Sequence, residues 1–584
     1  MRIIGINAYH GDSSACLIVD GQLVAAVEEE RFRRIKHWAG LPTESIRYCL
    51  EEADITLDQV DAIAINQDAK ANLWKKVTFM LTKRPDLGLV LDRIKNKRER
   101  LSVVDQLAQT FPDQRFNGKV HAIEHHLAHL YSAFYVSPYD QAVTISVDGF
   151  GDFSSGAWGV GRGKEIKIDG NVFFPHSLGI FYQALTQYLG FPNYGDEYKV
   201  MGLAPYGKAK YLNEMREIVL LQDDGSYRLN LDYFRHHKES VATEWENGSP
   251  VFGCLFSDKV AELLGPVRAK GEDLSQKHMD IAHSIQAMYE EAFFHLLNKL
   301  HERHGLDAVT VAGGCGMNSV ANGKITRFTP FTKVYIQSAA GDAGGAIGAA
   351  FAVWNETDKD SSPRFLMDHA YWGPQYSNEV IGELLEEKSA EIKQQGCEIK
   401  KIEEESELYR VTAEAISEGK VIGWFQGRME WGPRALGNRS IVCDPRRADM
   451  KDILNLKIKK RESFRPFAPS ILRESVSEWF EQDDDVPFMM KVFQVKEQKR
   501  KDIPAVTHAD GSGRLQTVFK ATNARYYNLI EAFYRKTGVP IVLNTSFNEN
   551  EPVVCKPEEA LACFLRTKMD ILVMGDYMVT RSDS

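Results

Sequence analysis

Two short apolar runs, each followed by glycines and a helix-like segment, most restrict the folds open to this chain. Residues 308–312 read AVTVA and lead into Gly313 and Gly314, and residues 334–337 read VYIQ and lead into the glycine-rich segment 341–350. A short β-branched run of this kind is typical of a buried parallel strand. Glycines after it let the backbone approach a ligand closely, and a helix N-terminus favours an anion. The pattern predicts an α/β fold that binds a ligand at these turns.

A histidine pair and two aspartates form the strongest candidate for a metal site. His125 and His129 are four residues apart, so both imidazoles leave the same face of a helix. Residues 142–147 read AVTISV, a buried strand that ends at Asp148, and Asp342 follows a second strand in the same way. Such a donor set suits a divalent metal of the iron, manganese or zinc type. Histidine pairs also cap helices and hydrogen-bond within cores, which is the alternative.

Length and composition limit the architecture and the partners. A chain of 584 residues is too long for one core, so we expect a domain over 1–354, a polar linker over 355–365 and a domain over 366–584. The net charge of -10 argues against a nucleic-acid partner. No run is long enough to span a membrane, no signal peptide or internal repeat is evident, and the eight cysteines lack paired spacing. We therefore expect a cytoplasmic protein with free thiols and no membrane partner.

The N-terminal segment predicts a strand, a polar turn and two further strands. Residues 3–6 and 15–19 are apolar, and residues 10–14 between them read HGDSS. Asp20-Gly21 then makes a hairpin turn into a third strand at 23–27. This beginning resembles that of actin-like ATPases and sugar kinases, in which the polar turn faces the nucleotide phosphates.

The C-terminal half clusters cations beside glycine, proline and aromatic residues, although the chain as a whole is acidic. A strand-like run that begins at residue 539 follows them and ends in amides and hydroxyls. The cluster comprises Arg434, Lys459, Lys460, Arg461, Arg465 and Arg514, followed by Asn544 and Ser546. Guanidinium groups match phosphate oxygens in a bidentate fashion. The sequence thus predicts a phosphate site here, with surface ion pairs as the alternative.

Two further segments have more than one interpretation. Residues 195–207 are bounded by glycines and carry Glu197 and Lys199 close together, which fits either hydrogen bonds to ribose hydroxyls or a structural salt bridge. Residues 70–112 are helical in pattern and basic, with Lys95, Lys97, Arg98 and Arg100. We interpret that segment as an insertion with a solvated face rather than a nucleic-acid surface.

Five motifs in order make the chain resemble the O-carbamoyltransferases of the nodulation and antibiotic-tailoring family. They are EEERF at 28–32, the His125–His129 pair, YKVMGLA at 198–204, WGPRALGNRS at 431–440 and FRPFAP at 464–469. The resemblance implies an N-terminal actin-like domain (Kae1-like, of the ASKHA superfamily) and a C-terminal YrdC-like α/β domain. It implies that the C-terminal domain makes carbamoyl-adenylate from carbamoyl phosphate and ATP. The N-terminal domain would then transfer the carbamoyl group to a hydroxyl of a small-molecule acceptor.

The same resemblance implies roles for individual residues. ATP, as its magnesium complex, and carbamoyl phosphate would be bound by Arg434, Lys459, Arg465, Arg514, Asn544 and Ser546. The metal, which is iron in the family and expected as Fe(II), would be held by His125, His129, Asp148 and Asp342. The adenylate in the transfer site would contact Glu197, Gly313, Gly314 and Asn318. The base that takes the acceptor's proton would be His10, since no other histidine lies nearby, although an extra glycine separates it from Asp12.

Two other functions are compatible with parts of the sequence. A fused tRNA-threonylcarbamoylation enzyme would share both halves, but the acidic net charge counts against it. A non-catalytic regulator that binds nucleotide and metal on an actin-like scaffold is the second alternative, and the intact set of arginines counts against that. The acceptor is not predicted, although its pocket is expected within 70–112 and 208–275. We expect a homodimer.

Overall fold

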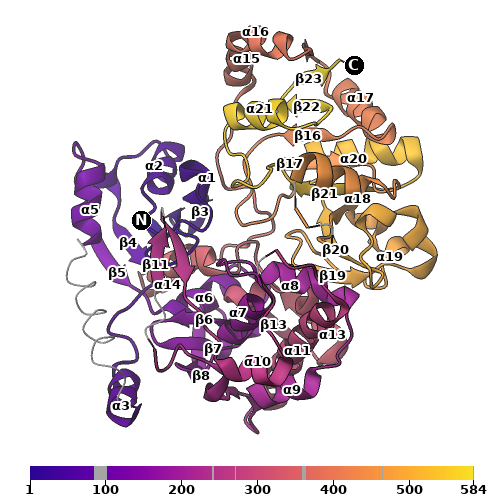
Figure 1. Ribbon diagram of the computed structural model, residues 1–584. Coiled ribbons are helices and arrows are strands. Elements are labelled where there is room, and N and C mark those ends of the chain that lie inside the picture. Colours follow the sequence, from indigo (N-terminus) through magenta and orange to yellow (C-terminus); the bar gives the residue numbers. More distant parts are fainter. Residues whose placement is uncertain are drawn as a thin grey trace. The chain divides into compact units, whose positions relative to one another are not determined.

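The computed structural model of the chain combines helices and sheets in two units, Met1–Met367 and Asp368–Ser584 (Figure 1). This confirms the mixed α/β class. The structure describes residues 1–83, 102–239, 243–246, 248–269, 271–357, 363–459, 461–462 and 464–582. Outside the described residues lie the predicted basic residues Lys95, Lys97, Arg98, Arg100 and Lys460, and positions 358–362 of the predicted linker. Within the described ranges, no helix is both long and apolar enough to cross a membrane.

The first sheet of the N-terminal unit is built on the predicted hairpin. Its order is β3-β2-β1-β4-β5. The strands are β1 (Arg2–Asn7), β2 (Ser14–Val19), β3 (Gln22–Glu28), β4 (Ala62–Ile65) and β5 (Lys119–Ala122). β1 pairs antiparallel with β2 and parallel with β4. The predicted strands and the polar turn over 3–27 are therefore confirmed.

A second sheet repeats this strand order and these strand directions. Its order is β14-β13-β6-β7-β8. The strands are β6 (Gln141–Gly151), β7 (Ser154–Arg162), β8 (Glu165–Phe173), β13 (Ala308–Ala312) and β14 (Lys333–Tyr335). β6 pairs antiparallel with β7 and parallel with β13, as β1 does with β2 and β4. The N-terminal unit thus contains a repeat of strand order, which can recur without a repeat of the sequence.

The remaining elements of the N-terminal unit are helices and short hairpins. The hairpin strands are β9 (Val219–Leu221), β10 (Tyr227–Leu229), β11 (Thr243–Glu246) and β12 (Ser249–Phe252). The helices are α1 (Glu30–Arg33), α2 (Thr43–Glu52), α3 (Leu73–Lys83), α5 (Val103–Thr110), α6 (His125–Phe134), α7 (Leu178–Tyr188), α8 (Glu197–Leu203), α9 (Leu212–Ile218), α10 (Asp258–Leu264), α11 (Gln276–His304), α12 (Ser319–Asn322), α13 (Ile325–Phe328) and α14 (Gly345–Thr357). Helix α14 ends three residues beyond the predicted domain boundary at residue 354.

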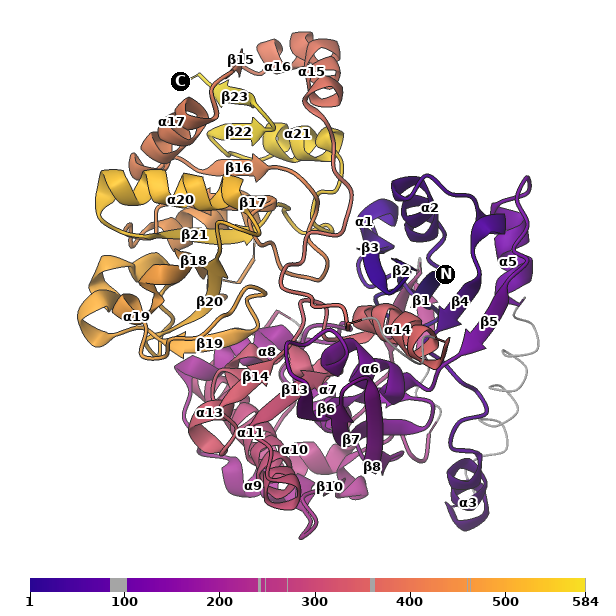
Figure 2. The same ribbon diagram turned by 180° about the vertical axis from the view of Figure 1, so that it is seen from behind.

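Helix α14 packs directly on the first sheet and on α6. The side chains from Gly345 to Trp354 are all buried. A Cβ atom added at Gly348 would overlap the carbonyl oxygen of Ala128 in α6, and one added at Gly5 in β1 would overlap that of Ala346. Glycine therefore allows backbone-to-backbone packing at both contacts. Figure 2 shows α14 beside β1 and α6.

The C-terminal unit is built around one nine-stranded mixed sheet, ordered β15-β23-β22-β16-β17-β21-β18-β20-β19. The predicted strand in the run that begins at residue 539 is confirmed as β21. The strands are β15 (Cys397–Lys401), β16 (Ile422–Phe425), β17 (Arg439–Cys443), β18 (Ala468–Leu472), β19 (Lys491–Gln494), β20 (Ser512–Val518), β21 (Ile541–Ser546), β22 (Ile571–Met574) and β23 (Tyr577–Arg581). The helices are α15 (Asn378–Glu387), α16 (Ser389–Gln394), α17 (Glu405–Ser417), α18 (Met450–Leu454), α19 (Val476–Trp479), α20 (Ala524–Thr537) and α21 (Pro557–Arg566).

Gly348→Ala should destabilise the N-terminal unit by about 1–3 kcal/mol, because the added methyl group must push α14 away from α6. The midpoint of urea unfolding measures this loss. Glu356→Ala, at the exposed end of the same helix, is the control and should change the free energy of unfolding by less than about 0.5 kcal/mol. A Gly348→Ala midpoint equal to that of the unaltered protein would contradict the close packing of the two helices.

Candidate functional site

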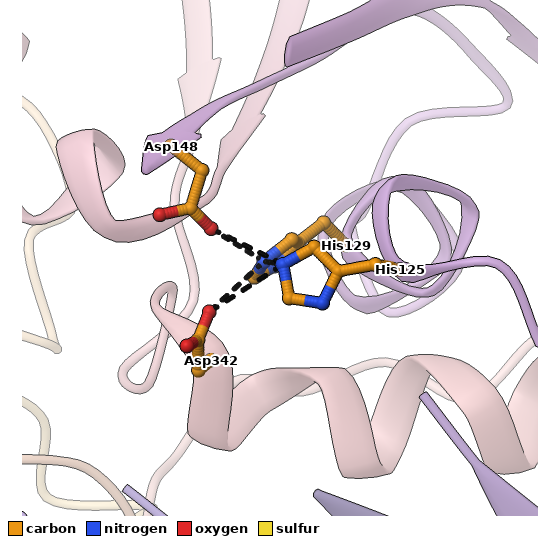
Figure 3. A group of neighbouring side chains, drawn as sticks. All are labelled: His125, His129, Asp148 and Asp342. Atoms are coloured by element: carbon orange, nitrogen blue, oxygen red, sulfur yellow. Dashed lines mark hydrogen bonds and ion pairs between the residues drawn. The ribbon is translucent and has the colours of Figure 1, made fainter. Parts of the chain in front are cut away.

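The four predicted metal ligands converge in the N-terminal unit (Figure 3). His125 and His129 leave one face of α6, Asp148 lies near the end of β6, and Asp342 opens the turn before α14. The Nε2 atoms of the two histidines are 3.1 Å apart, and the Nε2 atom of His129 lies 2.9 Å from Asp148 Oδ2 and 3.4 Å from Asp342 Oδ1. All four donor atoms lie within 4.8 Å of one another.

This donor set fits a divalent cation. Ligands about 2.1 Å from a tetrahedral ion lie about 3.4 Å apart, close to the separations in the cluster. Two imidazole nitrogens facing two carboxylates in a buried site also need positive charge between them. One feature departs from the common pattern, in which a ligating histidine donates through its second nitrogen. Within the described chain, the Nδ1 atoms of His125 and His129 have no hydrogen-bond partner.

The buried charges of the cluster shift one another's pKa values. Burial acts to lower the pKa of His129, but hydrogen bonds with Asp148 and Asp342 outweigh it and raise that pKa to about 9. Burial acts to raise the pKa of Asp148, but the two imidazoles bring it well below its usual range. Burial and the charge of Asp148 raise the pKa of Asp342. The two carboxylates therefore need positive charge close to them, which a bound divalent metal would supply.

The turn between β1 and β2 brings His10 next to the metal cluster. The ring centroids of His10 and His125 are 5.3 Å apart. Tyr9 and Asp12 in the same turn have φ angles of 66° and 59°, a left-handed conformation that costs energy for residues other than glycine. The side-chain amide of Asn7 donates to two carbonyls of the turn and helps to hold it. His10 therefore lies where a base could act on a group bound at the cluster.

A second histidine lies beside this turn, which corrects the expectation that His10 has no histidine neighbour. The Nδ1 atom of His37 is 2.8 Å from Asp12 Oδ1. The segment after β3 returns to the turn, because the backbone N–H of Ser13 donates to the carbonyl of Trp38 at 2.7 Å. The sequence carried only a weak signal for this contact, namely the position of His37 five residues after the EEERF motif.

Two of the predicted adenylate contacts lie against the strand that carries Asp148, and a third lies near His37 and Asp12. Gly314 packs on the ligand Asp148, since an added Cβ atom would lie 2.8 Å from Asp148 Oδ1. Gly313 has a φ angle of 87° and lies against the carbonyl of Val147. Glu197 opens α8, and burial raises its pKa to about 7 against the opposing charge of His37. The glycine turn thus borders the ligand Asp148, and Glu197 lies within electrostatic reach of His37 and Asp12.

Asn318 and Lys199 make their contacts to other protein groups. The side-chain amides of Asn318 and Gln286 exchange two hydrogen bonds of 3.0 and 3.1 Å, and Asn318 also caps α12. Lys199 pairs with Asp196 at 2.8 Å rather than with Glu197. The ion pair of Lys199 is thus with Asp196 and not with the predicted Glu197, and Glu197 lies within electrostatic reach of His37 and Asp12.

The guanidinium groups of three arginines gather around that of Arg514 in the C-terminal unit. Burial and then the charges of Arg434, Arg461 and Arg465 hold the pKa of Arg514 well below its usual range. Among the described residues, no group accepts a hydrogen bond from the Nε atom of Arg514. Like charges brought this close repel, so an anion with several charges would bind between them favourably. Arg461 belongs to the cation cluster predicted from the sequence, although the family resemblance assigned it no role, and it lies within electrostatic reach of Arg514.

The other predicted phosphate ligands make hydrogen bonds within the fold. The ammonium group of Lys459 is 2% exposed and donates to the carbonyls of Ser546 and Asn548. The Nδ2 atom of Asn544 donates to Ala435, Ser470 and Gln516, each at 3.0 Å. These bonds hold the end of β21 and the loop that carries Arg434. Direct contact of these residues with a ligand stays a prediction.

Comparison with known proteins relates the chain to a family. Two family models match, Carbamoyltransferase N-terminus over residues 2–351 and Carbamoyltransferase C-terminus over residues 413–581. Nodulation protein NolNO of Sinorhizobium fredii is 40% identical over 581 residues, 98% of this chain and 80% of that protein. The 3'-hydroxymethylcephem-O-carbamoyltransferase of Amycolatopsis lactamdurans is 31% identical over 275 residues, 47% of this chain and 49% of that enzyme. The crystal structure of T. kodakarensis HypF aligns with a TM-score of 0.31 and 12% identity over 61% of this chain and 48% of that chain.

Asp342→Asn should weaken the binding of a divalent cation at least about tenfold, because it removes the charge of one of the four candidate ligands. Metal content per chain, measured after equilibration with limiting Fe(II) under anaerobic conditions, tests this. His121→Gln, on β5 and outside the cluster, is the control and should keep the metal. Unchanged metal content in Asp342→Asn would remove this residue from the ligand set.

Proposed function

The chain belongs to the carbamoyltransferase family, and from this membership we propose that it is an ATP-dependent O-carbamoyltransferase with two sites. In the proposal, a YrdC-like C-terminal unit makes carbamoyl-adenylate, and an actin-like N-terminal unit transfers the carbamoyl group to a hydroxyl of a small natural product or sugar. The observation that carries it is the cluster of guanidinium groups around Arg514. The repeated strand order of the two N-terminal sheets supports the actin-like assignment.

The proposed synthesis occurs in two balanced steps. Carbamoyl phosphate and water give carbamate and phosphate. A carbamate oxygen then attacks the α-phosphorus of ATP, and the bond to the β-phosphate breaks to release pyrophosphate. Negative charge develops on the phosphate oxygens, so catalysis depends mainly on fixed positive charge and positioning. Arg434, Arg461, Arg465 and Arg514 would supply that charge, while Lys459, Asn544 and Ser546 would line the same site.

The proposed transfer consumes carbamoyl-adenylate in the N-terminal unit. The acceptor oxygen attacks the carbamoyl carbon, its proton passes to a base, and AMP leaves. His10 is the proposed base, since imidazole suits proton transfer near neutral pH and lies beside the cluster. His125, His129, Asp148 and Asp342 would hold Fe(II), which when bound supplies positive charge to the adenylate. Glu197, Gly313, Gly314 and Asn318 would surround the adenylate.

The protein supplied with magnesium ATP and carbamoyl phosphate should release pyrophosphate, and Arg514→Gln should lower that rate about 100-fold. The reason is the loss of one fixed charge from the cluster. A coupled pyrophosphate assay measures the rate. Arg535→Gln, which removes a largely exposed guanidinium on α20, is the matched control and should leave the rate unchanged. A wild-type protein that releases no pyrophosphate would contradict the proposed function.

His10→Asn should keep pyrophosphate release and lower carbamoyl transfer at least about 100-fold, because it removes the proton acceptor without touching the C-terminal unit. Screening sugars and hydroxylated natural products for the mass gain of one carbamoyl group first identifies an acceptor. The same mass assay then compares His10→Asn with His121→Gln, which should retain transfer. If His10→Asn still transfers at the wild-type rate, the base is another residue.

A further inference from the structure

The pair formed by His37 and Asp12 is the feature of the N-terminal unit to which the proposed reaction assigns no role. Its side chains approach to 2.8 Å, yet both stay about one-third exposed, at 30% and 35%. Both residues have left-handed backbones, with φ angles of 56° and 59°. Such strain costs energy and persists where the surrounding structure enforces it, most often at functional sites.

The surroundings of His37 fix which ring nitrogen can meet a ligand. Asp12 accepts a hydrogen bond from Nδ1, so Nε2 is the ring nitrogen that can meet a ligand. The backbone N–H of His37 donates to Glu30 at 2.9 Å, and the ring of Tyr194 meets the imidazole edge-on at 5.2 Å. Gly195 lies beside Nε2, and a Cβ atom added there would come within 2.5 Å of it. A side chain at position 195 would therefore cover Nε2.

The charges that face His37 favour its protonated form. Burial acts to lower its pKa, but the charge and hydrogen bond of Asp12, with help from Glu30, outweigh burial and raise the pKa to about 9. Lys36 opposes this shift, and Glu197 on α8 also lies within electrostatic reach. At neutral pH the ring is therefore an imidazolium whose Nε2–H is a charged donor.

Charged neighbours also shift the pKa of Asp12, the other member of the pair. Burial and the charge of Asp148 act to raise the pKa of Asp12, but His37 and Arg31 outweigh them and lower it. The electrostatic reach between Asp12 and Asp148 places the pair close to the metal cluster. His10 occupies the same turn, and its ring lies 5.3 Å from that of His125. The imidazolium thus belongs to the surroundings of the proposed transfer site.

An anionic ligand in this site needs more positive charge than the metal cluster offers. The charge of a divalent cation would be balanced by Asp148 and Asp342. A phosphate ester that binds at the cation therefore gains from a second positively charged donor. Charge-assisted hydrogen bonds from a protonated nitrogen to a phosphate oxygen are among the stronger polar contacts in proteins.

We propose that His37 is an anion-binding residue of the transfer site, whose Nε2–H donates to a phosphate oxygen of the adenylate. Asp12 is then the positioning residue that orients the ring and keeps it charged. This inference rests on the proposed function and deepens it, because it names the group that receives the adenylate phosphate in the N-terminal unit.

AMP is the probe for this assignment, and isothermal titration calorimetry at pH 6, 7 and 8 measures its affinity for the full-length protein. All variants carry Arg514→Gln as background, so that binding in the C-terminal unit is weakened. His37→Gln should bind AMP at least about tenfold more weakly than this parent at every pH, since it loses the charged donor. His121→Gln, outside the cluster, should match the parent.

Asp12→Asn separates an electrostatic role from a structural one. Without the carboxylate, the pKa of His37 falls toward its ordinary value near 6.5, so the ring is charged at pH 6 and neutral at pH 8. Relative to the parent, AMP affinity should therefore be nearly unchanged at pH 6 and reduced about tenfold at pH 8. A loss that is the same at every pH would overturn the assignment.

Three further outcomes would also be decisive. Unchanged AMP affinity in His37→Gln overturns the inference, while pyrophosphate release by the unaltered protein leaves the proposed function standing. Absence of pyrophosphate release with the expected AMP results overturns the proposed function and supports an anion site at His37. The donor atoms of Asp12, Glu30 and His37 also lie within 4.8 Å of one another. Loss of one metal ion per chain in His37→Gln would therefore assign a cation site and overturn the proposal.

Discussion

The buried contact between two imidazoles and two carboxylates is the interaction on which the N-terminal unit depends. His125 and His129 are fixed by α6, and Asp342 is fixed by the turn that begins α14. The distance between these groups is therefore set by the distance between α6 and α14. At Gly348 the backbones of the two helices lie in direct contact, so this distance is short. Packing of an apolar helix thus sets the geometry of a charged site.

The duplicated sheet explains why distant segments meet at this cluster. In each repeat, the first strand (β1 or β6) ends in a turn that leads to its antiparallel neighbour (β2 or β7). The first of these turns carries Asp12, and the second borders Asp148. The carboxylate of Asp152 in the second turn accepts from the backbone N–H of His125 and so supports the start of α6. The glycine turn after β13 then lies against Asp148. Both repeats contribute equivalent turns to one site.

The parts of this site that the sequence predicted are those with a local signature. His125 and His129 share a helix face, and Asp148 ends an apolar strand, so periodicity was sufficient for them. The contact between His37 and Asp12 depends on how the segment after β3 returns to the turn, which no periodicity encodes. The repeat of strand order was equally hidden, since it is a property of hydrogen-bond pairing. The hydrogen bonds that Lys459 and Asn544 make within the fold depend on which strand ends face these residues, and the sequence does not show that.

The two units use different kinds of positive charge, and the difference follows from the chemistry proposed for each. Guanidinium groups stay protonated at every physiological pH, which suits the C-terminal cluster around Arg514 to binding polyphosphate but not to accepting a proton. The charge of an imidazole group changes with its neighbours. The pKa of His126 is lowered to about 3, whereas the pKa of His37 is raised to about 9. Transfer to a hydroxyl needs one group that takes a proton and another that stays charged. A site built from histidines with different carboxylate neighbours can provide both.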